Sequence, residues 1–207
     1  MTQYAFFFDN SRCTGCRTCQ MACKDYKDLA CDISYRKVYD YEGGTTEVGE
    51  DGTVTTSCFM YHLSVSCNHC DDPACARVCP TGAMHKDPET GLVSVDEGKC
   101  IGCGYCHMAC PYNSPEVDRE VGHSVKCDGC ADRVSQGLEP ICVGACPLRA
   151  LSFGTAEEMA ALGDQAAIAP LPEADLTNPN LYILPCPAAS AEAASQGTVT
   201  NIKEVLQ

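Results

Sequence analysis

The chain has 207 residues, 19 cysteines and no tryptophan, and its formal net charge at pH 7 is −14. This charge and the scattered Lys and Arg residues argue against a nucleic-acid partner, because a protein that follows a phosphate backbone needs a basic surface. No stretch approaches the roughly 18 apolar residues of a membrane span, and residues 1–10 lack the basic start and long apolar run of a secretory signal, so neither a membrane-spanning chain nor a self-exported one is expected.

An aromatic-rich segment and a cysteine motif begin the chain. Residues 3–8 predict a short strand that runs directly into the motif. The motif has the spacing C-x2-C-x2-C-x3-C and consists of Cys13, Cys16, Cys19 and Cys23. In iron–sulfur proteins with this spacing, three thiolates hold three irons of one 4Fe–4S cube, and the fourth ligates another cluster. Lys24 stands where such motifs usually have proline.

Between the first and second cysteine motifs, apolar and aromatic residues recur on an even spacing. They are Ile33, Tyr35, Tyr39 and Tyr41 before a Gly-rich acidic loop, and Phe59, Tyr61, Leu63 and Val65 after it. Alternation of this kind predicts two strands with one buried face. Residues 31–66 are therefore expected to form a long hairpin.

The second and third motifs flank another predicted hairpin. The second motif is Cys67, Cys70, Cys75 and Cys79, with one widened interval, and the third is Cys100, Cys103, Cys106 and Cys110, which matches the spacing in full. Residues 83–95 between them carry turn chemistry at residues 87–91, between short apolar segments.

The fourth motif inserts eleven residues between Cys130 and Cys142 and consists of Cys127, Cys130, Cys142 and Cys146. In isolation, two close cysteine pairs also suit a zinc site. The ending Cys142-x3-Cys146-Pro147 repeats the other motifs and favours iron–sulfur ligation, whereas an odd number of dense cysteines suits disulfides poorly. Because thiolates must be deprotonated and brought together before they bind, the cluster-free chain is expected to be largely unfolded.

After the last motif, residues 151–154 predict a strand. Thr155 and Glu158 have capping-box spacing before a helix that Gly163 is expected to end. From Ala169 onward the frequent proline predicts an extended arm on the body or on a partner, with a disordered tail as the alternative. The chain is thus divided into a cluster domain over residues 1–154 and a helix with a Pro/Ala-rich arm over residues 155–207.

The residues outside the motifs do not form a recognisable catalytic site. No Ser-His-Asp arrangement, phosphate loop or dinucleotide fingerprint is present, so substrate chemistry is expected on another chain. The spare cysteines are expected to be buried apolar residues with no assigned role; they are Cys31, Cys58 and Cys186. Three cations beside cluster ligands are expected either to raise a cluster potential or to form surface ion pairs; they are Lys24, Lys126 and Arg149.

Together the four motifs resemble, in number, order and spacing, the four-cluster iron–sulfur (beta) subunits of dimethyl sulfoxide reductase and related membrane-bound molybdoenzymes. The likeness covers residues 4–169 and rests on the segments CTGCRTCQMAC, CNHCDDPACARVCPTGAMH, CIGCGYCHMACPY and KCDGCADRVSQGLEPICVGACPLRAL. It implies an α+β, double ferredoxin-like fold of two pseudo-symmetric lobes with short strands, hairpins and helices. Lobe one comprises about residues 1–30 and 120–154, lobe two about 58–115, and the hairpin insertion about 31–66.

The resemblance also implies that the motifs exchange ligands in the pairs one with four and two with three. The implied ligand sets are Cys13, Cys16, Cys19 and Cys146 for cluster one; Cys23, Cys127, Cys130 and Cys142 for cluster two; Cys67, Cys70, Cys75 and Cys110 for cluster three; and Cys79, Cys100, Cys103 and Cys106 for cluster four. Relatives with a three-iron centre have tryptophan in the third motif. This chain has no tryptophan, so four [4Fe–4S] clusters are expected, and histidine ligation is not.

By the same resemblance, the chain is a non-catalytic subunit of an anaerobic respiratory complex. It would relay single electrons between a quinol-oxidising membrane anchor near cluster four and a molybdopterin catalytic subunit near cluster one. A place at the cytoplasmic membrane follows, with the side left open and export with a signal-bearing partner as one route. His85 is a candidate to tune the cluster near the quinol. An independent soluble polyferredoxin and a zinc-binding interaction module are the alternatives.

Overall fold

A computed structural model describes residues 2–165, 168–189 and 196–205, and a four-stranded sheet lies at its centre. The strand order is β10 (Leu151–Thr155), β1 (Tyr4–Asp9), β12 (Leu181–Leu184) and β11 (Asp164–Gln165). Strand β1 pairs antiparallel with β10 and parallel with β12. Phe6 and Phe8 join the main hydrophobic core, while Ala5 and Phe7 pack against Met159 of helix α6 (Ala156–Ala160). Both faces of the predicted N-terminal strand are therefore buried.

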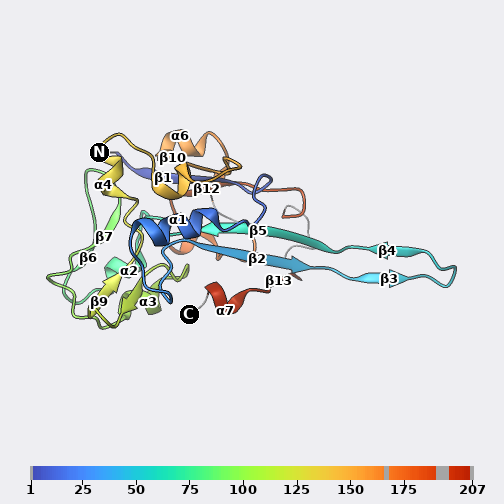
Figure 1. The fold of residues 1–207 in the computed structure, drawn as a ribbon, viewed down its shortest axis with the longest axis horizontal. Helices are drawn as coiled ribbons and strands as arrows, with labels where there is room; N and C mark the ends of the chain where they lie inside the picture. Colours follow the sequence, from blue (N-terminus) through green and yellow to red (C-terminus); the bar gives the residue numbers. More distant parts are fainter. Residues whose placement is uncertain (1, 166–167, 190–195, 206–207) are drawn as a thin grey trace.

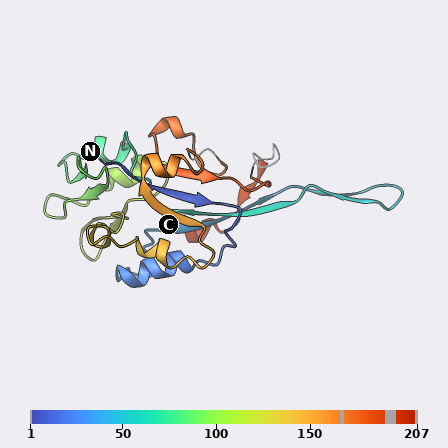
Figure 2. The same ribbon diagram turned by 90° about the horizontal axis from the view of Figure 1, so that it is seen from above.

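The predicted long hairpin is confirmed. Strands β2 (Lys37–Gly43) and β5 (Phe59–Val65) pair antiparallel, with Tyr39 opposite Leu63 and Tyr41 opposite Tyr61. The ribbon continues into β3 (Thr46–Val48) and β4 (Val54–Thr56), whose residues are all exposed and which extend far beyond the body (Figures 1 and 2). The expectation of one buried face is wrong at the base of the hairpin, where Val38 and Ser64 are also buried, because β1 and the cysteine loops cover that side.

Short helices and hairpins surround the sheets and carry the cysteine motifs. The helices are α1 (Thr18–Tyr26), α2 (Ala74–Arg77), α3 (Tyr105–Ala109), α4 (Ala131–Val134) and α5 (Ile141–Gly144). The predicted hairpin at residues 83–95 is confirmed as β6 (Met84–Lys86) and β7 (Val93–Val95), and a further one joins β8 (Glu116–Asp118) to β9 (His123–Val125). Helix α1 packs on α5 and α2 on α3, so elements of motif one meet those of motif four and elements of motif two meet those of motif three.

The C-terminal part is more integrated than the sequence predicts. The capping box is confirmed, with Glu158 N–H donating to Thr155 Oγ1 at 3.2 Å, and α6 ends shortly before Gly163. The expectation that the remainder is an extended arm is wrong for β12, which lies inside the central sheet, because the prolines flank its apolar residues rather than interrupt them. A short 3-10 helix, η1 (Ala174–Leu176), precedes it.

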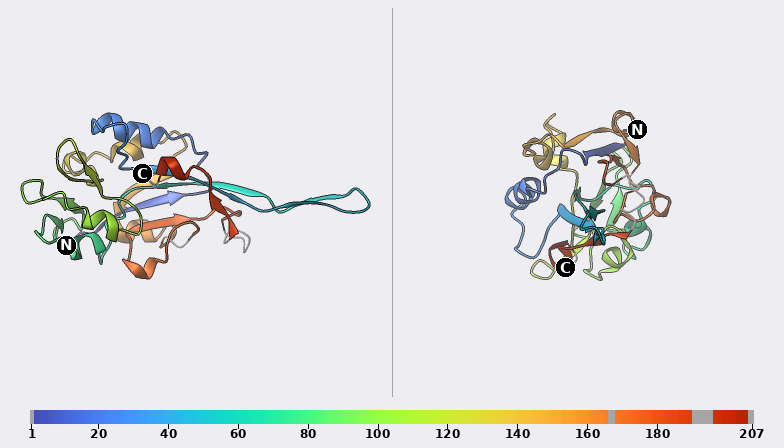
Figure 3. Two further views of the ribbon diagram at one scale, coloured as in Figure 1. Left: turned by 90° about the horizontal axis from the view of Figure 1, so that it is seen from below. Right: turned by 90° about the vertical axis from the view of Figure 1, so that its right-hand side faces the viewer.

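The last described elements return to the hairpin. Strand β13 (Thr198–Val199) pairs with β2, and helix α7 (Ile202–Val205) lies against β2 with Val205 buried (Figure 3). The arm predicted for residues 190–195 falls outside the described residues. At the far end of the body from the hairpin tip lie α3, β6, β7 and β9 (Figures 1 and 2). Within the described residues, no helix is both long and apolar enough to cross a membrane.

Candidate functional site

Four sets of cysteines converge, and each combines three cysteines of one motif with the last cysteine of another. Set one consists of Cys13, Cys16, Cys19 and Cys146, which line one cavity. Set three lines a second cavity with Cys67, Cys70, Cys75 and Cys110, and set four a third with Cys79, Cys100, Cys103 and Cys106. In set two, Cys23 interacts electrostatically with Cys127, Cys130 and Cys142. The structure thus brings together the cysteines that the family resemblance grouped.

The fourth motif is divided between two of these sets. Cys146 faces the cavity of the first motif, whereas Cys142, four residues earlier, belongs with Cys23. Helix packing explains the division, because α5 carries Cys142 against α1, and the chain then turns toward the end of α1 that carries Cys19. A zinc site built from the four cysteines of this motif alone does not agree with that arrangement.

Glycine immediately before the second cysteine of a motif lets the loop turn tightly around its cavity. Gly15 and Gly102 hold this position in the first and third motifs, and both have positive φ, at 67° and 64°. A Cβ atom on Gly102 would lie 2.6 Å from the carbonyl oxygen of Gly122. A side chain there would therefore meet both backbone strain and a rigid neighbour.

Burial raises the thiol pKa at several positions in the four sets. Desolvation is the largest cause at each of four positions, and neighbouring cysteines add to it. The pKa of Cys13 rises to about 11, and those of Cys70, Cys75 and Cys130 to about 12. Without a metal partner these thiols keep their protons at neutral pH, so they suit a positively charged group that displaces the protons.

Backbone N–H groups are directed at several of the sulfur atoms. Ala150 donates to Cys146 at 3.3 Å, and Gly129 donates to Cys127 at 3.4 Å. In set four, Ser124 N–H donates to Cys100 at 3.3 Å. Donors of this kind stabilise negative charge on sulfur and favour the reduced form of a bound cluster.

The hydroxyl of Ser124 gives a direct test of this effect. It lies 3.3 Å from Cys106 Sγ, and it becomes the donor once that sulfur is a thiolate. Ser124→Ala removes this bond and keeps the backbone bond to Cys100. We expect the midpoint potential of the set-four cluster to fall by about 20–60 mV, the equivalent of one ordinary hydrogen bond. Redox titration followed by EPR measures this midpoint potential.

Thr81→Ala is the control, because Thr81 lies 3.7 Å from Cys79 and makes a weaker contact in the same set. An equal or larger shift of the potential in Thr81→Ala would contradict the prediction.

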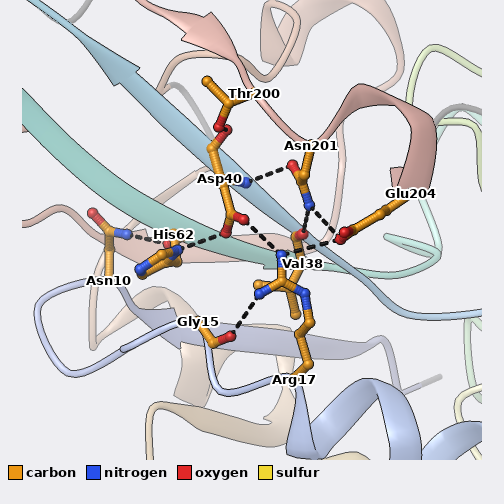
Figure 4. Close-up of polar contacts among 9 residues, drawn as sticks. All are labelled: Asn10, Gly15, Arg17, Val38, Asp40, His62, Thr200, Asn201 and Glu204. Atoms are coloured by element: carbon orange, nitrogen blue, oxygen red, sulfur yellow. Dashed lines mark hydrogen bonds and ion pairs between the residues drawn. The ribbon is translucent and has the colours of Figure 1, made fainter.

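A polar network fastens the loop of set one to the C-terminal helix (Figure 4). Arg17 donates to Gly15 O at 3.0 Å, to Asp40 Oδ2 at 2.6 Å and to Glu204 Oε2 at 3.1 Å. His62 contacts Asp40 Oδ1 through Nδ1 at 2.8 Å. Burial raises the pKa of Asp40, but the bonds from Arg17 and His62 outweigh this effect and lower it overall. Sequence reasoning missed the network, because its members come from both ends of the chain.

The three cations that the sequence singled out bond to carbonyl groups. Lys24 Nζ donates to Ala30 O at 2.9 Å and Cys31 O at 3.0 Å, and Arg149 donates to Cys146 O at 3.2 Å. Lys126 is buried and donates to Val93 O and Cys127 O. In the part of the chain that the structure describes, none of the three pairs with a carboxylate, so the alternative of a surface ion pair is wrong.

The remaining candidates lie outside the four sets. Cys31 and Cys58 are exposed, so the expectation of buried apolar cysteines is wrong for both, whereas Cys186 packs against the main core. His85 Nδ1 bonds Ala83 O at 2.9 Å, and its tuning role stays a prediction. His69 is wholly buried, and desolvation lowers its pKa.

Comparisons with known proteins agree with this geometry. A protein-family model described as a 4Fe-4S dicluster domain matches residues 58–156, and another described as a 4Fe-4S binding domain matches residues 4–25. The chain is 55% identical to the B subunit of the anaerobic dimethyl sulfoxide reductase of Escherichia coli (strain K12), over 99% of both proteins. It is 53% identical to the B subunit of the same name from Haemophilus influenzae, over 99% of this chain and 100% of the other.

A more distant relative is the thiosulfate reductase electron transfer subunit of Salmonella typhi, 39% identical over 75% of this chain and 78% of the other. The matched domains agree with the predicted α+β ferredoxin-like fold and with bound 4Fe–4S clusters. Because the likeness to the two B subunits extends over nearly the full length, the chain belongs to the family of non-catalytic 4Fe–4S electron-transfer subunits that includes the B subunit of anaerobic dimethyl sulfoxide reductase.

Proposed function

We propose that the chain relays single electrons through four [4Fe–4S] clusters between a quinol-oxidising membrane anchor and a molybdopterin catalytic subunit of a dimethyl sulfoxide reductase-like complex. The observation that carries this proposal is the convergence of sixteen cysteines into four sets of four. Each set matches the thiolate number that one cube requires. Sets one to four are the proposed ligands of clusters one to four.

The bound cubes supply one-electron redox chemistry, and the protein controls the setting in which it takes place. The cysteine thiolates hold the irons, and apolar side chains such as Phe8, Val38 and Leu151 line the walls of set one and limit water. The N–H donors at the sulfur atoms, described above, favour the reduced state. No residue has to act as an acid or base, in agreement with a chain that does not itself transform a substrate.

An exposed apolar surface supports an anchor contact at set four. Ile101, Tyr105 and Met108 are 65%, 52% and 71% exposed, and Cys103 beside them is also exposed. A cavity of about 420 Å³ adjoins this surface and is lined in part by Cys103, His107 and Met108. An apolar patch at a cluster edge suits a membrane-embedded partner, which would also bring the electron donor close. The chain itself would then be peripheral to the membrane.

The projecting hairpin supports a second, larger partner. Strands β3 and β4 are exposed on both faces, and Val48 and Val54 are 71% and 62% exposed. A two-stranded ribbon is at best marginally stable in water without packing, so this one suits insertion into another chain. We assign it to the catalytic subunit. The alternative is an independent soluble polyferredoxin, which would not need such a ribbon.

Anaerobic purification through a tag on this chain tests the proposal. We expect about sixteen irons per chain, matching sulfide, molybdenum and two additional chains. Iron and sulfide without molybdenum or partners would replace the proposal with the free polyferredoxin, and zinc without sulfide would contradict both.

A shortened hairpin tests the catalytic partner. Replacing residues 46–56 with a short turn keeps the β2–β5 ladder, which ends at Gly43 opposite Phe59. We expect an unchanged iron content but an at least tenfold loss of copurified molybdenum. The matched control is Thr46→Ser with Thr55→Ser, which keeps the ribbon and its two exposed valines and should retain the molybdenum. Retained molybdenum in the shortened chain would overturn the assignment of the hairpin.

A further inference from the structure

Arg36 is a buried cation at the base of the long hairpin. Its side chain is almost completely enclosed, with 2% of the residue exposed. The guanidinium donates to Ser64 O at 3.1 Å, to Ser64 Oγ at 3.2 Å and to Ser66 Oγ at 2.9 Å. Its carbon Cζ lies 4.8 Å from the centre of the Phe6 ring, and its Nε has no hydrogen-bond partner among the described residues. The site therefore holds the guanidinium in one orientation.

The described part of the chain provides this charge with no carboxylate partner. The next residue is also a buried cation, but Lys37 pairs with the Glu116 carboxylate at 3.0 Å. Serine hydroxyls and an aromatic face stabilise a guanidinium but do not neutralise it. Enclosing a full charge without a counter-charge is strongly unfavourable, so the negative charge that balances Arg36 has to come from its other neighbours.

Those neighbours are cysteines of two different sets. The guanidinium interacts electrostatically with Cys19 of set one and with Cys23, Cys127 and Cys142 of set two. Ser64 Oγ, which accepts from Arg36, also lies 3.2 Å from Cys19 Sγ. Arg36 is thus located between the two sets and is linked to one of them through a shared hydroxyl.

We propose that Arg36 is a shared counter-cation for clusters one and two and that it stabilises the reduced form of both. An oxidised cube with four thiolates carries a charge of about −2, and the electron that it accepts makes it more negative. A fixed cation in a water-poor gap lowers the free energy of the reduced state and also weakens the repulsion between the two cubes. This inference rests on the proposed ligand sets.

Redox titration of the intact complex, followed by EPR, tests the role of the charge. Arg36→Met removes the charge and keeps much of the volume, whereas Arg36→Lys keeps the charge. In the methionine variant we expect the reduction equilibrium constants of clusters one and two to fall about tenfold or more, about 59 mV for a one-electron couple. Clusters three and four should change far less. Lysine should restore most of the shift.

The control is Arg133→Met, which removes a guanidinium that also lies over an aromatic ring, 5.4 Å from the centre of Tyr26, but that is partly solvated. Its effect should be much smaller. Intact clusters with unchanged potentials in Arg36→Met, or equal shifts in the methionine and lysine variants, would overturn the role of the charge and leave the proposed function standing. Clusters lost in Arg36→Met but present at native potentials in Arg36→Lys would support it. A wild-type chain without cubes would instead contradict the proposed function.

Discussion

Replacing Cys146 with alanine is expected to remove the cube of set one and to spare that of set two. The reason is the position of Cys146 in the cavity lined by Cys13, Cys16 and Cys19, away from its own motif partners. Alanine provides no ligand atom, and the fourth iron of that cube is left without its thiolate. Iron and sulfide should fall by about one cube in four, with the EPR spectrum of the other three retained.

Double variants identify which cysteines share a cube. Cys146→Ala combined with Cys16→Ala should cost no more than about one cube, because both residues belong to set one. Cys146→Ala combined with Cys127→Ala should cost about two, because Cys127 belongs to set two. The opposite pattern would mean that each motif holds its own cluster. Cys58→Ala is the control, since Cys58 is exposed on the hairpin and outside every set, and its iron content should equal that of the wild type.

Local chemistry explains why the four cysteine motifs were predictable. The C-x2-C-x2-C spacing and the x3 interval before the last cysteine are short-range features, so the proposed ligands could be named residue by residue. Hairpins with alternating side chains, such as β2–β5, and the capping box at Thr155 are equally local. The grouping of Cys146 with Cys13, in contrast, was implied by family resemblance, because motif spacing alone does not say which chain segments meet.

Long-range packing explains what the sequence did not predict. Strand β12 is only four residues long between two prolines, and its place beside β1 depends on contacts with residues about 175 positions away in the sequence. Arg36 was missed for a related reason. If the strand had only one buried face, the side chain of Arg36 would lie on the face opposite to Tyr35 and would be in solvent. In the structure, Phe6 and Ser64 enclose it. A buried charge on the expected outer face is visible only in the folded chain.

Removing the clusters is expected to unfold residues 67–125 first. The hydrophobic cluster between sets three and four consists, in the described residues, of Cys75, Met84, Val93 and Cys106, so half of its buried members are proposed ligands. Apolar burial on that scale does not offset the entropy of ordering such a segment, and cluster binding supplies the difference. The central core is independent of the cubes to a greater degree, because it contains the apolar side chains of Phe6, Leu63 and Ile183.

Hydrogen exchange on cluster-free and cluster-loaded chain distinguishes the two regions. We expect amides in residues 67–125 to lose nearly all protection, and those of β1, β5 and β12 to keep part of theirs. The cluster-free chain should also lose most of its native circular dichroism, because the short helices that carry the cysteines have few other contacts. Equal protection in both regions, or a native-like spectrum without iron, would show that the chain folds independently of its clusters. The expected pattern would mean that β1, β5 and β12 form a preassembled base on which the cubes order the remaining loops.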